Sequence, residues 1–534
     1  MRRYGFTNAE LDRVKKEWLA AYEKSYNERT TVRNIRRAQE CIRHYLDGAP
    51  MPGEAWEYQV VQQMLPMIGV DMLNQIAGQL VTDENLIISF QAPEDSAVVL
   101  PTEAEAIQFL AEVKNQEIEA PVEETIREKL VETAPKPGKI KRTQYDEHLG
   151  TTEWTLSNGV RVVVKPTTFK QDEILFQGMS LGGASQVDTE NLPSSMLAST
   201  IVDFSGLADM SMTDLQKALT GKNVSHSASI NNNTETVSGS STVKDLETLL
   251  QLNYLAFTAP RRDEEAFQTL MSILQSQLAN KDKNPKAVFS DSIQMMATNN
   301  SSRTVLENMT LVERVNLDKA LEIYKARFAN PADFVFTFVG NVDPQDETFK
   351  QLICTWLGGM KTSKKREQVI NHNVRAPQGI CKNYFTRNME TKTASNRIQY
   401  TSYEMPYTLA NALNMEVIGR ILSTRYLESI REREGGSYGV GCAGMMDILP
   451  TPCARLIMQF DTDPEKQQKL INIIHEELDK NGYWQTALYM YYLYGINYIT
   501  DYQSAVENIT AESVQKTLKS LVESGNMFEV VMLP

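Results

Sequence analysis

The sequence predicts an α+β protein built from repeated domains, and three observations support this. A unit of one helix followed by one short strand recurs at Val70–Phe90, Leu317–Gly340 and Ile509–Leu533. A hairpin pattern, with a Ser-Asn-Gly turn at 157–159 between two apolar runs, opens a second kind of segment. The chain has 534 residues, well beyond the roughly 250–300 at which one hydrophobic core stops growing. Several related domains are therefore expected.

Each copy of the unit carries its own evidence for a helix and a strand. Apolar residues recur at helical spacing and stop near an asparagine, and an apolar run follows at Leu86–Phe90, Phe334–Val339 or Phe528–Leu533. A full domain's length of chain precedes the second copy. Only a long charged helix pattern, Thr7–Leu46, precedes the first, so the first domain is expected to lack its beginning.

Composition along the chain predicts the domain boundaries. Residues 96–148 are dense in Glu, Lys and Pro, which is typical of a solvated linker with one or two exposed helices. A second charged, proline-containing stretch covers residues 361–381. The prediction is a partial domain at 1–95, a linker at 96–148, and further domains at 149–370 and 378–534.

Charge and hydropathy exclude two classes of function. The formal charge of −14 argues against nucleic-acid binding, because phosphate contacts need clustered Lys and Arg. No run approaches the roughly 18 uninterrupted apolar residues of a membrane span. The first residues pass directly into a charged amphipathic helix, so the localisation stays unknown from sequence. A periplasmic or exported location would require a signal peptide upstream of this segment.

Cysteine and histidine are too scattered to form a local metal site. There are five of each, with no C-x-x-C pair and no two histidines within a helical turn. His475 opens an H-E-E-L sequence, but Asp479 stands where a second histidine ligand would be needed. Cys442 and Cys453 could face each other across a hairpin, although buried free thiols are the favoured interpretation. No metal site and no cofactor site is expected in this chain.

A glycine pattern, G-x-G-x-x-G, lies at residues 439–444. A dinucleotide-binding loop has a strand before this pattern and a helix after it. Here the order is inverted, because residues 409–434 have helical spacing, Gly435 and Gly436 form a helix stop, and a strand, a proline-rich turn and a second strand follow. A phosphate loop is therefore excluded. No G-x-S-x-G nucleophile elbow is present either.

The repeated domains, the sequence LSNGVRVVVKP at 156–166 and the sequence LESIREREGGSYGVG at 427–441 resemble the insulinase/pitrilysin family of zinc metallopeptidases, the inverzincins. The resemblance covers essentially the whole chain and is strongest to the second half of the large single-chain bacterial members. It implies four homologous α+β domains, each a mixed, mainly antiparallel sheet with helices on one face, as in processing peptidases. In that family two halves close around a substrate chamber, and the first domain holds zinc through H-x-x-E-H and a distant Glu.

The resemblance also implies site residues. The fourth domain of the family supplies an Arg and a Tyr seven residues later, and Arg431 and Tyr438 match that spacing. A guanidinium and a phenol aimed at a scissile carbonyl would stabilise the negative charge that develops during peptide hydrolysis. Without the resemblance, Arg431 reads as one more exposed helix charge and Tyr438 as a sheet residue.

The sequence departs from the family pattern in two places. The five positions that match H-x-x-E-H are Ser, Ser, Met, Leu and Ala at 194–198, so this domain is expected to be an inactive homologue of the zinc domain. The catalytic domain would then lie upstream of Met1. Near Lys480-Asn481 the family carries an additional helix-length segment that this sequence lacks, through either a deletion or an unmatched loop.

The resemblance therefore predicts the non-catalytic C-terminal portion of a zinc peptidase. Zinc is expected in the full-length enzyme and not on this chain. The expected partners are the N-terminal catalytic half, as the same polypeptide or a separate subunit, and peptide substrates; a homodimer is also compatible. The alternative is a catalytically inactive peptide-binding or scaffolding subunit of the same family.

Overall fold

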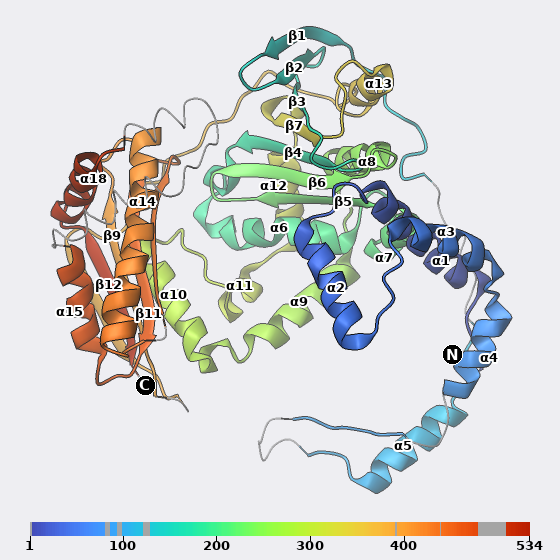
Figure 1. Ribbon diagram of the computed structural model, residues 1–534, viewed down its shortest axis with the longest axis horizontal. Helices are drawn as coiled ribbons and strands as arrows, with labels where there is room; N and C mark the ends of the chain where they lie inside the picture. The colour runs from blue at the N-terminus through green and yellow to red at the C-terminus, as the bar shows by residue number, and fades with distance from the viewer. Residues whose placement is uncertain are drawn as a thin grey trace.

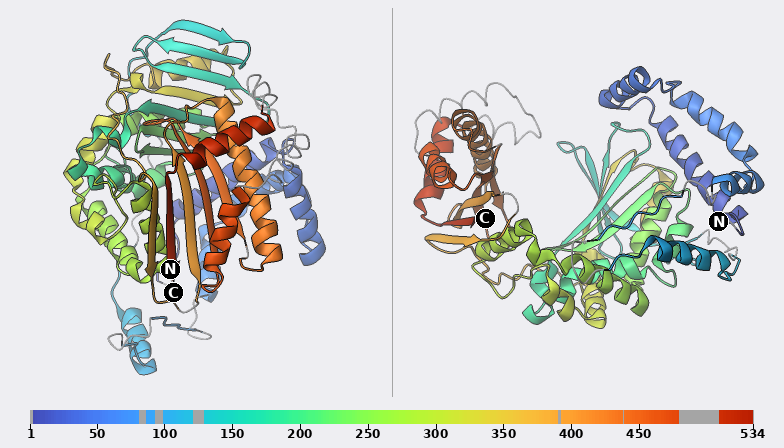
Figure 2. Two further views of the ribbon diagram at one scale, coloured as in Figure 1. Left: turned by 90° about the vertical axis from the view of Figure 1, so that its left-hand side faces the viewer. Right: turned by 90° about the horizontal axis from the view of Figure 1, so that it is seen from below.

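Two β-sheets, each covered by helices, form the body of the molecule (Figure 1). The computed structural model describes residues 3–80, 86–92, 99–120, 129–389, 392–437, 439–478 and 509–533. In both figures the N-terminal helices and the second sheet lie on opposite sides of the first sheet, so the chain forms an open arch (Figures 1 and 2).

The first sheet has seven strands in the order β1-β2-β3-β7-β4-β6-β5. Its strands are β1 (Ile140–Asp146), β2 (Thr151–Leu156), β3 (Arg161–Pro166), β4 (Ile174–Leu181), β5 (Val224–Ile230), β6 (Thr234–Ser241) and β7 (Val335–Gly340). Only β3 and β7 pair in parallel, and the other neighbours are antiparallel. The predicted turn joins β2 to β3, where Gly159 has φ +88°, a conformation that favours glycine.

The second sheet repeats the topology of the first. Its strands, in the order β10-β11-β9-β12-β8, are β8 (Ile380–Thr386), β9 (Ala394–Ser402), β10 (Val440–Asp447), β11 (Cys453–Thr462) and β12 (Met527–Leu533). Only β8 and β12 are parallel. The five strands β8, β12, β9, β11 and β10 therefore follow the same order and directions as β3, β7, β4, β6 and β5. This duplication confirms the predicted repeated, mainly antiparallel α+β domains.

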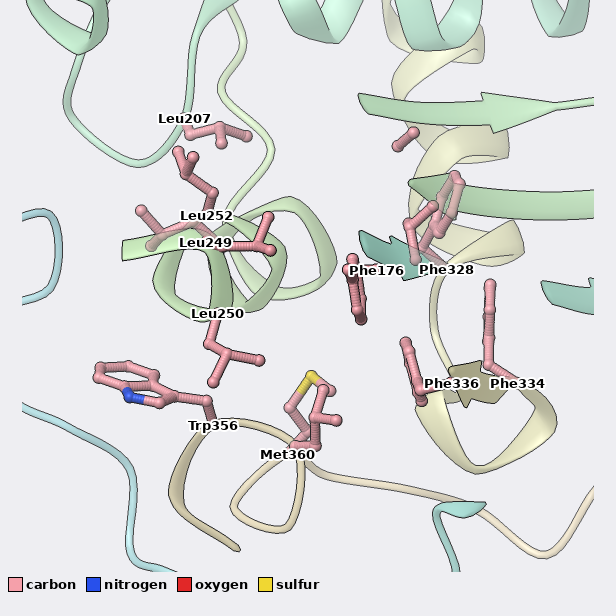
Figure 3. Packing of buried hydrophobic residues seen from close by; sticks show 14 of the residues in the cluster. Phe176, Leu207, Leu249, Leu250, Leu252, Phe328, Phe334, Phe336, Trp356 and Met360 are labelled. Atoms are coloured by element: carbon pink, nitrogen blue, oxygen red, sulfur yellow. The ribbon is translucent and has the colours of Figure 1, made fainter. Parts of the chain in front are cut away.

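Helices cover one face of each sheet. Those of the first unit are α6 (Leu192–Ser205), α7 (Met212–Ala218), α8 (Leu246–Thr258), α9 (Glu264–Leu278), α11 (Met309–Arg314), α12 (Leu317–Arg327) and α13 (Glu347–Trp356), while α10 (Pro285–Ala297) packs on β12, on the other face of the second sheet. Those of the second unit are α14 (Leu409–Tyr426), α15 (Gln467–Leu478) and α18 (Ala511–Glu523). Apolar side chains between sheet and helices form a separate core in each unit. Figure 3 shows part of the first core, where phenylalanines meet leucines of α8.

The repeated helix-strand unit is confirmed in two of its three copies. In the second copy Asn316 caps α12 through a bond from Lys319 N (2.9 Å), and β7 follows. In the third copy Thr510 caps α18, and β12 follows. In the first copy the helix forms as α4 (Val70–Leu80), but residues 86–92 contain no strand.

The N-terminal region is helical, as the charged helix pattern at Thr7–Leu46 predicts. It is divided into α1 (Asn8–Asn27) and α2 (Asn34–Asp47), and α3 (Glu54–Met64) and α4 follow. Helix α1 ends at Asn27, whose Nδ2 donates to Asp172 Oδ2 (2.8 Å). This bond attaches α1 to the first sheet. Lys244 and Glu23 form a second link (3.0 Å). The linker contains α5 (Glu103–Asn115), and β1 begins before the predicted domain start at 149.

Among the described residues no helix is both long and apolar enough to cross a bilayer. All five cysteines are free thiols. Cys442 lies opposite Met458 in the β10–β11 ladder, so it does not face Cys453 across the hairpin. Within this framework the domain boundaries remain predictions.

Candidate functional site

Arg431 lies just beyond the end of α14 (Leu409–Tyr426). Thr408 caps the start of α14 by accepting from Asn411 N (3.1 Å), and the helix continues to Tyr426. The next residues, Leu427–Arg433, form a π-helical segment, η6. Such widened turns are rare and occur often at functional sites. The side chain of Arg431 is exposed on this segment, whereas Ile430 beside it is fully buried in the core.

The two glycines after this segment end the helix, as predicted. Gly435 has φ +54° and donates to the carbonyl of Arg431 (3.0 Å), while Gly436 donates to that of Ile430 (3.1 Å). Thr462 Oγ1 donates to the carbonyl of Gly436, which joins the turn to the end of β11. These bonds fix the backbone that carries Arg431. Tyr438, the second predicted site residue, lies outside the described residues.

The glycine pattern forms part of a strand, and one of its glycines allows a helix to pack closely on that strand; it is not a phosphate loop. Gly441 and Gly444 lie in β10, after a helix and before a hairpin, which is the predicted order. A Cβ on Gly444 would lie 1.9 Å from the carbonyl oxygen of Met415, and one on Gly419 would lie 2.4 Å from Gly444 N. Helix α14 therefore packs directly against the backbone of β10 at these two glycines. By contrast, a Cβ on Gly441 would meet only ordinary contacts.

The positions that match the zinc motif lie on α6, which follows β4 in the first unit. Ser194, Ser195 and Ala198 are almost completely buried, at 2%, 2% and 0% exposure. Ser194 Oγ accepts a hydrogen bond from Asn316 N (3.0 Å). Neutral, short side chains in this closely packed place provide no imidazole or carboxylate ligand, so these residues do not fit a zinc ion.

His475 takes part in a polar cluster with Tyr400 and Glu529. It lies on α15, and its Nδ1 is 2.8 Å from Tyr400 Oη, while its Nε2 is 3.8 Å from Oε2 of Glu529. Burial raises the pKa of Glu529, and Lys382 opposes that shift. No group of three His, Cys, Asp or Glu side chains with the geometry of a metal site occurs in the part of the chain that the structure describes.

The sequence interpretation missed a row of polar side chains in the second sheet. Ser395, Arg397, Gln399 and Thr401 alternate along β9 and point to the face opposite α14, α15 and α18. The signal was present, because apolar Ile398 and aromatic Tyr400 occupy the intervening positions. The register that brings β11 residues beside this row, however, depends on tertiary structure.

Comparison with known proteins connects this geometry to a family. Residues 314–481 match the family model described as the peptidase M16 inactive domain. The chain is 26% identical over 494 residues to the zinc protease PQQL-like of Arabidopsis thaliana, covering 90% of this chain and 49% of that protein. It is 23% identical over 481 residues to the probable zinc protease PqqL of Escherichia coli, covering 89% and 51%.

Structural similarity extends over the full chain. The crystal structure of the periplasmic protease PqqL from Escherichia coli matches with a TM-score of 0.65 and 19% identity, covering all of this chain and 62% of that one. At this identity the match shows the fold. The chain spans about half the length of the curated relatives it matches.

Proposed function

This chain carries the inactive domain of the M16 peptidases, the family of insulinase and pitrilysin, and on that premise we propose that it is the non-catalytic C-terminal portion of a zinc-dependent peptidase. The proposal is supported by a family match to the inactive domain together with zinc-motif positions that hold no metal ligand. The family match covers residues 314–481, and the zinc-motif positions on α6 hold only Ser, Met, Leu and Ala. Zinc would be held by an N-terminal half with its own H-x-x-E-H motif.

The contribution of this chain would be to bind and orient the peptide. Arg431 projects from η6 on a backbone that Gly435 and Gly436 fix. A guanidinium held in this way can donate to the scissile carbonyl oxygen, and its positive charge favours the oxyanion that forms when that carbonyl is attacked. The phenol of Tyr438 would be the second donor, by virtue of its sequence position. Because these hydrogen bonds hold the backbone at the helix end, the guanidinium would need little reorganisation during the reaction.

The expected partners follow from the same premise. The N-terminal half would face the open side of the arch, and peptides would be the substrates. Since one matched structure is that of the periplasmic protease PqqL, an exported location is proposed for this chain as well.

The proposal is tested by reconstitution. The chain is mixed with the separately produced zinc-bearing half of the same protein, and cleavage of an internally quenched peptide is followed by fluorescence. Wild type should restore cleavage, whereas Arg431→Ala should lower kcat/KM by about 10²–10³-fold, the cost of one lost oxyanion donor. Tyr438→Phe should lower it similarly. Arg433→Ala, an exposed arginine two residues along the same π-helical segment, is the matched control and should retain full activity. Equal rates for Arg431→Ala and Arg433→Ala would refute the assigned role.

A scaffolding subunit is the second candidate, and the same ligand-free α6 positions favour it. The two candidates differ in gene context. An H-x-x-E-H sequence upstream in the same frame, or in a neighbouring gene, supports the peptidase; its absence from both supports the scaffold.

A further inference from the structure

The second sheet has a polar face whose charges are not balanced. This polar sheet face is the side away from α14, α15 and α18, formed where β9, β11 and β10 lie next to one another. Direct opposition in the ladders places three rows on it: Thr401–Arg455–Met445, Gln399–Ile457–Ala443 and Arg397–Gln459–Gly441. Helix α10 covers the β12 side of the same face, where Phe289 packs on Phe528.

Arg397 carries the unbalanced charge. Its Nη1 donates to Oε1 of Gln459 (3.1 Å) and its Nη2 donates to Oε1 of Gln399 (3.0 Å), so both acceptors are neutral amides. Its Nε is buried without a hydrogen-bond partner. A guanidinium has five N–H donors, and only two of these are used. Within the described residues Arg397 forms no ion pair with a carboxylate.

The nearest charged neighbour makes the imbalance larger. Burial, and after it the positive charge of Arg455 on the same face, lowers the pKa of Arg397 to about 10. Arg455 donates to Asp447 Oδ2 (2.5 Å), which neutralises one of the two guanidinium groups. The Nε of Arg455 is also buried without a partner. The pair Arg397 and Arg455 therefore has one carboxylate between them, in a chain of formal charge −14.

The carboxylate at the other end of the face is already in use. Asp461 accepts from Lys286 Nζ (2.5 Å) and from Ser395 Oγ (2.7 Å), so it is paired across α10 and β9. Because this ion pair is complete, it leaves the charge of Arg397 uncompensated. The cost of holding such a charge near the protein interior is offset when an anion binds.

Space for a ligand exists beside Arg455 and Gln399. A cavity of about 140 Å³ is lined by Arg455, its partner Asp447, and Gln399, the amide that accepts from Arg397; Thr401, Tyr403 and Arg375 also line it. On the β10 side the face carries only Gly441 and Ala443 beside the Arg397 and Gln399 rows, and both are exposed. Small residues on this edge strand keep the guanidinium group of Arg397 within reach of a ligand, whereas Met445 lies beside Arg455.

We propose that Arg397 and Arg455 form a carboxylate-binding site on the polar sheet face, which takes a carboxylate of a bound peptide. Planar guanidinium groups match carboxylate geometry, and the free donors of Arg397 provide the hydrogen bonds. The source is either the C-terminal carboxylate of the peptide or an acidic side chain. This inference rests on the proposed peptide-handling function, since strand β10 begins directly after the turn that follows Arg431.

The test measures binding by the whole chain, independently of cleavage. Three fluorescein-labelled peptides of about ten residues share one neutral sequence: one ends in a free carboxylate, one in an amide, and one in an amide after an internal Glu. Fluorescence polarisation gives each Kd. We expect the free acid or the Glu peptide to bind at least about tenfold more tightly than the neutral amide, and the preferred peptide identifies the source.

Variants assign the preference to the site. Arg397→Gln should reduce the preference to about twofold or less, and Arg397→Lys should keep part of it because the charge remains without the planar fork. Arg420→Gln is the matched control, because Arg420 lies on α14, pairs with Glu416 (2.7 Å) and changes the net charge equally. Thermal melting of each variant checks that it is folded.

Two results would overturn the proposal: equal or undetectable binding of all three peptides, or the same loss in Arg420→Gln as in Arg397→Gln. A carboxylate preference that persists while the Arg431 cleavage test fails would leave this site standing and reject the proposed function alone.

Discussion

Gly444→Ala should separate helix α14 from strand β10. The new Cβ would lie 1.9 Å from Met415 O and 2.7 Å from its carbonyl carbon, whereas real Cβ contacts are not closer than 3.0 Å. The two backbones would therefore have to move apart by at least 3.0 − 1.9 = 1.1 Å, because neither contacting atom belongs to a flexible side chain. Overpacking of this kind costs about 1–3 kcal/mol. For a unit of this size, each kcal/mol lowers Tm by about 2–4 °C.

The assay is calorimetric melting of the chain. Because a chain with two cores need not unfold in one step, hydrogen exchange of β10 and β11 identifies which transition belongs to the second unit. Gly441→Ala is the matched control in the same strand, where the nearest atom to the new Cβ is Gln459 O at 3.7 Å. It should change stability by less than about 0.5 kcal/mol. If Gly444→Ala melted within 1 °C of Gly441→Ala, the direct helix-to-strand contact would be refuted. The same shift would displace η6, so reconstituted cleavage should fall as well.

Three further predictions concern stability. Asp172→Ala should weaken the attachment of the N-terminal helices to the first sheet, because it removes the acceptor of Asn27 Nδ2 (2.8 Å) and leaves the Lys244–Glu23 link; limited proteolysis should then cut faster before residue 172. Asn27→Ala should give a smaller effect, because Asp172 then still accepts from Val243 N (3.0 Å). Arg327→Met should destabilise the first unit by about 3–5 kcal/mol in urea unfolding, since it leaves buried Glu235 (1% exposed) without its cation, and adding Glu235→Gln should recover part of the loss. Burial lowers the pKa of His226 to about 4. Below about pH 6.5 this histidine therefore takes up a proton in the unfolded chain but not in the folded chain, so the free energy of unfolding should fall by about 1–2 kcal/mol between pH 7 and pH 5. His226→Gln should remove this loss.

Local signals predicted the repeated framework well. In the second and third copies of the helix-strand unit, the cap at Asn316 or Thr510 and the apolar run that follows lie close together in sequence. The first copy has the same signals, yet Leu86–Phe90 forms no strand, and Ile87 is 90% exposed. A strand requires a neighbouring strand for its backbone hydrogen bonds, and this region provides none within the described chain. Propensity alone could not reveal that.

The site was only partly predictable for the same reason. The end of α14 at Gly435 follows from local sequence, but the π-helical turn at Arg431 depends on how the core takes up Ile430. The role of Gly444 depends on contact with Met415, which belongs to a different element. Arg397 and Arg455 lie on separate strands, so their proximity follows from the β9–β11 register and not from any motif.

The duplicated topology places the zinc-motif positions and Arg431 at opposite ends of two equivalent helices. Helix α6 follows β4 in the first unit as α14 follows β9 in the second, so the two helices occupy equivalent places. The motif positions on α6 are near its start, where Ser194 and Ser195 are enclosed by packing, and short neutral residues there favour a tight core. Arg431 comes after the far end of α14, where the chain leaves the core and a charged side chain remains solvated. Substitutions near the start of such a helix should therefore have little effect on the position of residues beyond its end. This separation would allow a protein whose motif positions hold no metal ligands still to position Arg431 for the role proposed above.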